Sequence, residues 1–365
     1  MKKHLIFYRG PLERSRLSLI IESVQQEGVS LYFMWIFPGK LTQKKKEHAE
    51  EFLRQYNIDQ IEFRGETAIN LVKTNLAFRR WMNRHQFSSV YLVGFSAPLF
   101  ALFKGSSKRI WFINGIPEEK GGGILSSLIA QILWKLQGWA SKATLVVTVS
   151  SRMSDYVLRR TRISNLFYVP TCTDLDIFRP KHEKERTYFT YLGSGAAWQA
   201  LDWLEAIWHE IHKQDPTIQF QVISRDERCK ILGQRIPKEN IRFVSSPNFS
   251  EVAGFLHESE AGFLLRKDNI VNQVCFPTKL GEYLATGSWV VSSDIDWDVK
   301  DWFNKFQIGI IVKPNTPASE IASAILTYRY KLMNNLIANN ILESSNQMDR
   351  QYWVKKLKMI IDKER

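Results

Sequence analysis

Three charged residues in the second half of the chain have the types and the spacing to bind a phosphorylated ligand. Arg266 follows a predicted strand, and Lys279 and Glu282 lie in a predicted helix that opens after Pro277. Backbone amides in the first turn of a helix attract anions, and a lysine there adds a full positive charge. An arginine at the end of a strand can donate two hydrogen bonds to the same phosphates.

Glu282 lies one turn beyond Lys279 and can only accept hydrogen bonds, so it could accept from both hydroxyls of a ribose. Thr278 is expected to cap this helix, and Gly287 to end it. The spacing leaves a second interpretation open. Lys279 and Glu282 could form an exposed pair of little energetic value, with Arg266 in solvent.

A glycine turn, Tyr191 to Gly195, follows another predicted strand. Glycines at Gly193 and Gly195 let the backbone come close to a ligand, and Ser194 lies between them. A helix expected from about Ala197 would direct its amino end toward the same place.

The elements that must position these residues alternate between strand and helix along most of the chain. The apolar runs predict strands at residues 4–8, 30–37, 60–63, 89–93, 109–113, 144–149, 188–192, 218–223, 241–244, 261–265, 289–292 and 309–312. Amphipathic spacing predicts helices near 13–26, 44–56, 68–84, 124–141, 152–159, 200–213, 249–257, 278–285, 318–335 and 347–363.

This alternation predicts an α/β protein with two doubly wound, parallel, Rossmann-like sheets whose carboxyl ends face a central cleft. The interruption rich in proline and charge near residue 180 predicts a linker. The expected organisation is an N-terminal domain at 1–169, a linker at 170–186 and a C-terminal domain at 187–345. A final helix at 346–365 is a candidate to pack back on the first domain.

The bulk composition is that of a folded protein, with 44% hydrophobic and 24% charged residues in 365. Three cysteines lie far apart, which argues against a disulfide framework or a zinc site. The sequence Asp294-Ile295-Asp296 matches a DxD motif, but we interpret it as a loop and helix cap and predict no metal. The net charge of +13 favours anionic partners, yet no nucleic-acid-binding motif accompanies it.

The segment from Phe276 to Gly287 resembles the C-terminal signature of the family 4 glycosyltransferases, a retaining group with the GT-B fold. The resemblance implies that Lys279 and Arg266 bind the donor diphosphate and stabilise it as it leaves. It further implies that Glu282 binds the ribose. Many members carry a glutamate where this chain has Val274, whereas a bacterial subset shares the Leu-Leu-Arg, Asn and Pro-Thr-Lys pattern found here.

The resemblance also places further nucleotide-binding positions, which are Thr278, Gly193, Ser194, Arg225 and Pro247. The implied reaction moves a sugar from a nucleotide-diphosphate sugar, of the UDP or GDP type, to a glycan or lipid-linked acceptor. It would retain the anomeric configuration, need neither a metal nor a cofactor, and serve bacterial surface polysaccharide synthesis. A nucleotide-sugar epimerase or a non-catalytic binding protein of the same fold are the alternatives.

The acceptor is expected on the N-terminal domain, near Gly10, Asn114 and Glu119. Glu118 and Glu119 could instead form an acidic turn that opens a helix. No apolar run is long enough to span a membrane, so a cytoplasmic protein is expected. The stretch 124–142 carries an apolar face beside Lys135 and Lys142, which could lie on anionic lipid at the inner face of the cell membrane or pack on its sheet.

Overall fold

The structure, a computed structural model, describes residues 2–10, 14–38, 42–66, 71–103, 105–120, 124–179, 185–246, 248–332 and 337–363. The chain divides into two compact units. Unit 1 comprises Met1–Pro170 together with Gln351–Arg365, and unit 2 comprises Thr171–Arg350.

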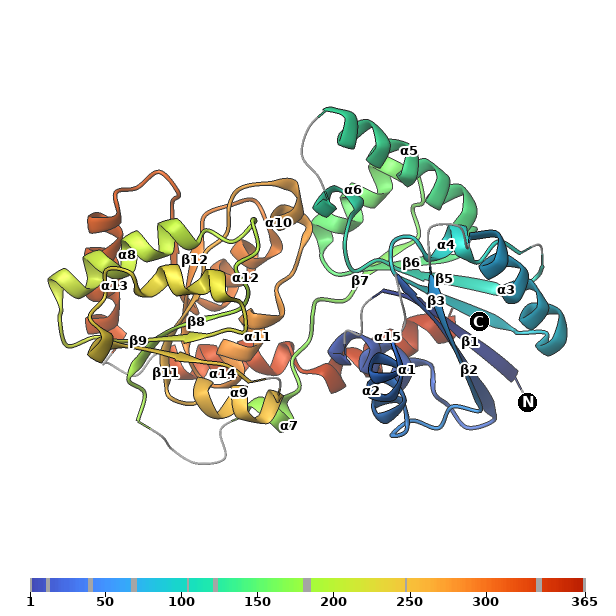
Figure 1. The fold of residues 1–365 in the computed structure, drawn as a ribbon, viewed down its shortest axis with the longest axis horizontal. Coiled ribbons are helices and arrows are strands. Elements are labelled where there is room, and N and C mark those ends of the chain that lie inside the picture. Colours follow the sequence, from blue (N-terminus) through green and yellow to red (C-terminus); the bar gives the residue numbers. More distant parts are fainter. Residues whose placement is uncertain are drawn as a thin grey trace. The chain divides into compact units, whose positions relative to one another are not determined.

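Unit 1 contains a parallel seven-stranded sheet in the order β3-β2-β1-β4-β5-β6-β7 (Figure 1). Its strands are β1 (Lys2–Arg9), β2 (Val29–Pro38), β3 (Gln60–Glu66), β4 (Ser89–Val93), β5 (Lys108–Phe112), β6 (Leu145–Thr148) and β7 (Leu166–Tyr168). Its helical segments are α1 (Arg14–Val24), α2 (Gln43–Leu53), α3 (Leu71–His85), α4 (Ala97–Phe100), η1 (Pro117–Lys120), α5 (Ile124–Ser141), α6 (Ser151–Thr161) and α15 (Arg350–Lys363).

Unit 2 contains a parallel six-stranded sheet in the order β10-β9-β8-β11-β12-β13. Its strands are β8 (Tyr188–Leu192), β9 (Gln219–Ile223), β10 (Ile241–Val244), β11 (Ser259–Leu264), β12 (Trp289–Ser293) and β13 (Gly309–Val312). Its helical segments are α7 (Leu175–Phe178), α8 (Leu201–Gln214), η2 (Glu227–Gly233), η3 (Lys238–Asn240), α9 (Phe249–Leu256), α10 (Ile270–Val274), α11 (Thr278–Ala285), α12 (Asp298–Phe306), α13 (Ala318–Leu332) and α14 (Ile337–Gln347).

The strand order of unit 2 reverses between β8 and β11, so the chain leaves these neighbouring strands in opposite directions. Ligands of open α/β sheets bind beyond the carboxyl ends of the strands at such a reversal. Gly193 follows β8 and Arg266 lies two residues beyond β11, which brings two separately predicted candidates to the same point. The predicted fold class, two Rossmann-like parallel sheets with helices between their strands, is confirmed.

The core of unit 2 lies between this sheet and α8, α11 and α13. On three adjacent strands, Phe189 meets Phe220 and Phe263 at ring-centre distances of 6.3 and 5.7 Å. Trp208 of α8 packs on Phe220 and Phe263 at 4.9 and 5.6 Å. All four side chains are fully buried. This cluster fixes the strands whose carboxyl ends carry the candidate residues.

Most predicted strands fall within one or two residues of the observed ones, but several elements differ. Helix α8 begins at Leu201, four residues beyond the position near Ala197 from which an amino end was expected to approach the glycine turn. The predicted linker, as far as the structure describes it, includes α7, which belongs to unit 2. The sequence also did not predict β7, α4, α10, α12, α14 or the 3-10 segments. Most of these elements are short and depend on tertiary contacts instead of a long hydrophobic period.

Helix α15 belongs to unit 1 although it follows unit 2 in the sequence. The buried face of α15 consists of Trp353, Val354, Leu357 and Ile361. Gln26 Nε2 at the end of α1 donates to Asp362 Oδ1 at 2.9 Å, and Lys358 Nζ donates to the Gln25 carbonyl at 3.4 Å. The last helix therefore completes the layer that includes α1.

Gly262, in the middle of β11, allows α11 to approach the sheet closely. A Cβ atom at this position would overlap the ring of Tyr283, which is fully buried. We expect Gly262→Ala to destabilise unit 2 by about 1–3 kcal/mol, because the ring and helix must move outward. Urea denaturation measures this loss.

Gly254 provides the matched control, since a Cβ atom there meets nothing within 4 Å in the middle of α9. Gly254→Ala should leave stability unchanged or raise it by up to about 1 kcal/mol, because alanine favours helix over glycine. Equal effects of the two substitutions would contradict the role assigned to Gly262.

Candidate functional site

The turn after β8 is held in one conformation by three hydrogen bonds. The Gly193 amide donates to the Ile223 carbonyl at 3.0 Å, and the Tyr191 hydroxyl donates to the Ser194 carbonyl at 2.7 Å. The Gly195 amide donates to Asp226 Oδ2 at 2.8 Å. Gly193 has a φ of +144°, a region that side-chain-bearing residues rarely adopt. The backbone is thus preorganised at the strand reversal.

Lys279 reaches this turn from the first turn of α11. A Cβ atom at Gly193 would overlap the Lys279 ammonium, so the lysine occupies the space that the glycine leaves. The Lys279 side chain is only 9% exposed, and its Nζ atom has no hydrogen-bond partner among the described residues. It lies 4.6 Å from the centre of the Tyr191 ring.

Burial lowers the pKa of Lys279 well below its usual value, and the positive charge of Arg266 lowers it further. The carboxylate of Glu282 acts in the opposite direction but more weakly. The interpretation of Lys279 as one half of an exposed surface pair is therefore wrong. A desolvated ammonium without hydrogen bonds is costly, and a bound anion would offset that cost.

Arg266 is 8% exposed and is fixed by a network centred on Asn272. Its Nη1 atom donates to Asn272 Oδ1 at 3.1 Å, while its backbone amide donates to Ser293 Oγ at 2.6 Å. The Asn272 amide nitrogen donates to the Trp198 and Lys267 carbonyls at 3.0 and 2.7 Å. The Arg266 Nε atom is buried without a partner within the described part of the chain. Its guanidinium thus keeps a donor for a ligand.

Glu282 lies one turn along α11 from Lys279 and is partly exposed. Loss of water around the carboxyl raises the pKa of Glu282 to about 7, against an opposing effect from Lys279. Thr278 is the first helical residue and not the cap, because Pro277 takes the capping position and makes no side-chain bond there. The first-turn amides of α11 therefore receive no side-chain cap.

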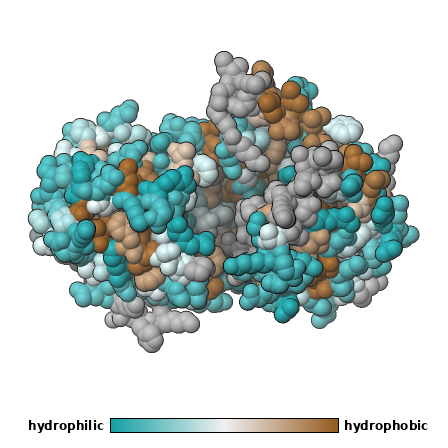
Figure 2. Space-filling view, in the orientation of Figure 1, coloured by the Kyte–Doolittle hydropathy of each residue, from teal (hydrophilic) through white to brown (hydrophobic). Residues whose placement is uncertain are grey.

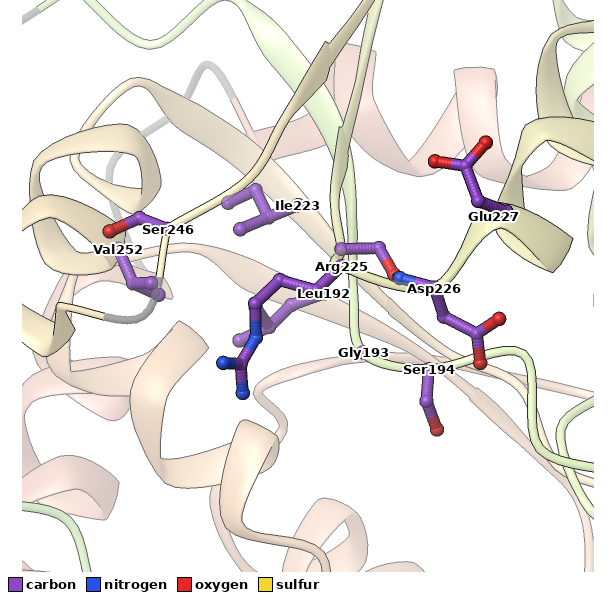
Figure 3. Close-up of a pocket in the computed structure, with 10 residues that line it drawn as sticks. Leu192, Gly193, Ser194, Ile223, Arg225, Asp226, Glu227, Ser246 and Val252 are labelled. Carbon is purple, nitrogen blue, oxygen red and sulfur yellow. The ribbon is translucent and has the colours of Figure 1, made fainter. Parts of the chain in front are cut away.

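A pocket of about 770 Å³ opens beside the Gly193–Ser194 turn (Figure 3). The ends of β8 and β9 and the segment after β10 line it, with Arg225, Asp226 and Ser246 among its polar groups. Pro247, a predicted nucleotide contact, lies outside the described residues. Gly193 thus borders both this pocket and the Lys279 ammonium, an arrangement that suits a ligand with a bulky group attached to an anionic one.

In unit 1 the predicted acceptor residues make contacts that stabilise their own surroundings. The Gly10 carbonyl accepts from Trp35 Nε1 at 2.9 Å, and Asn114 Oδ1 accepts from Arg16 Nε at 3.1 Å. Glu119 Oε1 accepts from the Ile116 amide at 3.2 Å, which closes the turn η1. Their role toward an acceptor stays a prediction.

Glu118 also has a structural contact, since it accepts from Trp134 Nε1 at 3.2 Å and from the Tyr156 hydroxyl at 2.5 Å. Together with burial, this bond raises the pKa of Tyr156 to about 12. These contacts agree with the alternative of an acidic turn, although η1 is a short 3-10 segment.

The motif Asp294-Ile295-Asp296 does not cap α12, because Trp297 precedes that helix and Asp294 Oδ1 pairs with Lys300 Nζ at 2.5 Å. Over the part of the chain that the structure describes, no three His, Cys, Asp or Glu side chains gather as they would around a metal ion.

Two residues that shape this site were assigned no role from their sequence context. Tyr191 lies under the Lys279 ammonium and holds the Ser194 carbonyl, and Asn272 positions Arg266. The sequence shows an asparagine between Arg266 and Lys279, but only the burial of Asn272 and its three side-chain hydrogen bonds identify it as a positioning residue.

Replacing Lys279 with methionine removes the buried charge and keeps most of the side-chain volume. We expect Lys279→Met to stabilise the unliganded protein by about 1–3 kcal/mol. In a unit of this size each kcal/mol raises Tm by roughly 2–4 °C. The difference should shrink as the pH rises, because the lowered pKa lets the folded wild type lose this proton before the unfolded chain does.

Thermal denaturation of both proteins, with Lys267→Met as control, tests this expectation. Lys267 is exposed, so its replacement should change stability by no more than about 0.5 kcal/mol. A Lys279→Met protein that is less stable than wild type would mean that the lysine is buried for structural reasons.

Comparison with known proteins finds no matching family model and no matching curated sequence. Solved structures do match over the full length. Anabaena HepE in complex with UDP and glucose has a TM-score of 0.74 at 11% identity, covering 100% of both chains. Thermosynechococcus elongatus sucrose-phosphate synthase has a TM-score of 0.74 at 12% identity, covering 100% of this chain and 99% of that one.

The lipopolysaccharide outer core galactosyltransferase WaaB has a TM-score of 0.70 at 12% identity, with both chains covered completely. These matches confirm the predicted resemblance at the level of three-dimensional structure. The chain has the GT-B fold, built from two Rossmann-like units.

Proposed function

We propose that this protein is a glycosyltransferase that moves a sugar from a UDP or GDP sugar to a glycan or lipid-linked acceptor. The observation that carries the proposal is the pair of buried cations, Arg266 and Lys279, at the strand reversal of unit 2. Neither has a carboxylate bound directly to it, and each retains buried donor capacity in the described structure. Such a pair fits a diphosphate better than it fits an unliganded core.

The reaction class follows from the charge that develops in sugar transfer. When the bond between the sugar and the diphosphate breaks, negative charge grows on the leaving phosphate. Fixed positive groups stabilise that growing charge more than they stabilise the bound substrate, and this difference accelerates the reaction. We assign this role to Arg266 and Lys279, with the first-turn amides of α11 behind them, and propose a metal-independent, retaining transfer.

The remaining nucleotide contacts are assigned from the geometry of the same turn. The carboxylate of Glu282 is the proposed ribose acceptor, and the turn at Gly193 and Ser194 is proposed to approach the diphosphate. The pocket with Arg225 is the proposed place of the base. A UDP donor is favoured by the similarity to HepE, whose structures contain UDP and UDP-glucose.

Thermal unfolding in the presence of UDP, GDP, ADP, CMP and dTDP tests the donor site. A nucleotide at about 100 times its Kd should stabilise the wild type by roughly 2.7 kcal/mol. Lys279→Met and Glu282→Ala should lose most of this stabilisation, whereas Lys267→Met should retain it because that side chain is exposed. If no nucleotide stabilises the wild type, or if the two variants respond as the wild type does, the proposed site is wrong.

The affinity for UDP should also depend on pH through Glu282. Ribose hydroxyls donate to the charged carboxylate, so binding favours the deprotonated form. Because the pKa of Glu282 is raised to about 7, affinity should fall as the pH drops below neutrality.

Calorimetric titrations between about pH 5.5 and 8.5 measure this dependence, with Glu282→Gln as reference. Ionisation of the UDP phosphate changes the affinity of both proteins, so the difference between them isolates Glu282. Identical pH profiles would exclude the carboxylate as a ligand.

A further inference from the structure

Helix α5 of unit 1 carries an apolar stripe that no other part of the described chain covers. Leu128, Ile132, Leu136 and Trp139 recur at helical spacing and form one face, with Ile129 beside them. Ile132 is 58% exposed and Trp139 is 68% exposed. Figure 2 shows hydrophobic residues gathered over α5, which lies at the top of Figure 1.

The opposite face of α5 already anchors the helix to its unit. Trp134 is fully buried and donates to Glu118, and Gln137 accepts from the Leu99 amide at 3.1 Å. The sequence left two interpretations of the apolar face open, packing on the sheet or contact with lipid. The structure shows that α5 has two apolar faces and that only the face with Trp134 packs against unit 1. The exposed apolar face needs another apolar environment.

The charges around the stripe indicate which environment that is. Between Glu66 and Asp155 the only acidic residues are Glu118 and Glu119, whereas eleven residues are lysine or arginine. Lys135 and Lys142 are exposed; helical geometry places Lys135 at one border of the stripe, and Lys142 directly follows the end of the helix. Basic residues beside an exposed tryptophan are typical of helices that lie at the surface of an anionic bilayer.

The neighbouring helix α3 shares these properties. It contains no acidic residue, and Val72 and Leu76 are exposed one turn apart. Asn75 of α3 donates to the Leu99 carbonyl, while Gln137 of α5 binds the amide of the same residue. Leu99 of α4 therefore connects the two helices.

We infer that α5, supported by α3, docks unit 1 onto the surface of an anionic lipid bilayer. No helix among the described residues is long and apolar enough to cross a membrane. The stripe instead lies in the plane of the interface, where its apolar side chains enter the acyl region and its lysines remain among the headgroups. If the proposed function holds, a lipid-linked acceptor would lie in the same membrane interface as α5. Only this statement about the acceptor depends on the proposed function.

Co-sedimentation with lipid vesicles tests docking without any donor or acceptor. The wild type should bind vesicles containing roughly one third phosphatidylglycerol at least tenfold more tightly than neutral phosphatidylcholine vesicles, with weaker binding as salt increases. The double variant Ile132→Gln/Trp139→Gln should bind at least tenfold less tightly. Lys135→Glu/Lys142→Glu should lose the preference for the anionic vesicles.

The matched control is Tyr330→Gln/Met359→Gln, which removes two side chains that are 79% and 64% exposed on α13 and α15. It should bind as the wild type does, and all variants should unfold at the wild-type temperature. The docking proposal is wrong if the wild type binds anionic vesicles no more tightly than neutral ones. It is also wrong if the Ile132→Gln/Trp139→Gln variant binds as tightly as the control.

A wild type that forms a dimer, which the α5 variant abolishes, would show instead that a second copy covers this face. The UDP thermal shift requires no vesicles, so failure of the donor site and failure of docking are distinguishable.

Discussion

The space for the Lys279 ammonium exists because Gly193 has no side chain, and the rest of the donor-side geometry depends on this close approach. Helix α11 can bring the lysine there only because Gly262 lets the Tyr283 ring lie against β11. The Leu192 amide in turn donates to the Tyr283 hydroxyl at 2.8 Å, which connects the helix to the end of β8. Two glycines, one directly after β8 and one within the adjacent strand β11, thus set the position of one charge.

The surroundings of Lys279 destabilise its charged form, because the ammonium is buried away from water. Arg266 adds a second positive group nearby, and its effect on Lys279 is repulsive. The large apolar core of unit 2 stabilises the fold enough to offset the free-energy cost of burying these two charges. The hydrogen bonds of Asn272 and Ser293 keep Arg266 from turning away. A preorganised site of this kind needs little rearrangement when an anion arrives.

Much of the fold could be predicted from the sequence, because continuous apolar runs such as Tyr188–Leu192 are typical of buried parallel strands. The helix Thr278–Ala285 was also predicted with its observed limits, since proline and glycine mark its ends. The sequence placed Arg266, Lys279 and Glu282 in one segment, but it could not decide between a buried and an exposed pair. Burial depends on Gly193 and Tyr191, some ninety residues away in the chain.

In unit 1 the contacts of the candidate residues likewise depend on the folded structure. Asn114 and Glu119 stand at the carboxyl end of a strand, where ligands often bind, but their partners Arg16 and Ile116 are defined only by the folded structure. The outward face of α5 has the same periodicity as an inward one, so only the position of Trp134 distinguishes them. The spacing of apolar residues predicts that a helix has an apolar face, but only the tertiary contacts show which face stays exposed.

The return of α15 to unit 1 has a consequence for how the protein is made. Synthesis proceeds from the amino end, so the ribosome completes all of unit 2 before it releases the helix that covers Ser23 and Gln26. Unit 2 is continuous in sequence and can fold while unit 1 still lacks one of its layers. Unit 1 therefore begins to be translated before unit 2 but is completed after it, and during that interval the part of α1 that α15 covers stays exposed.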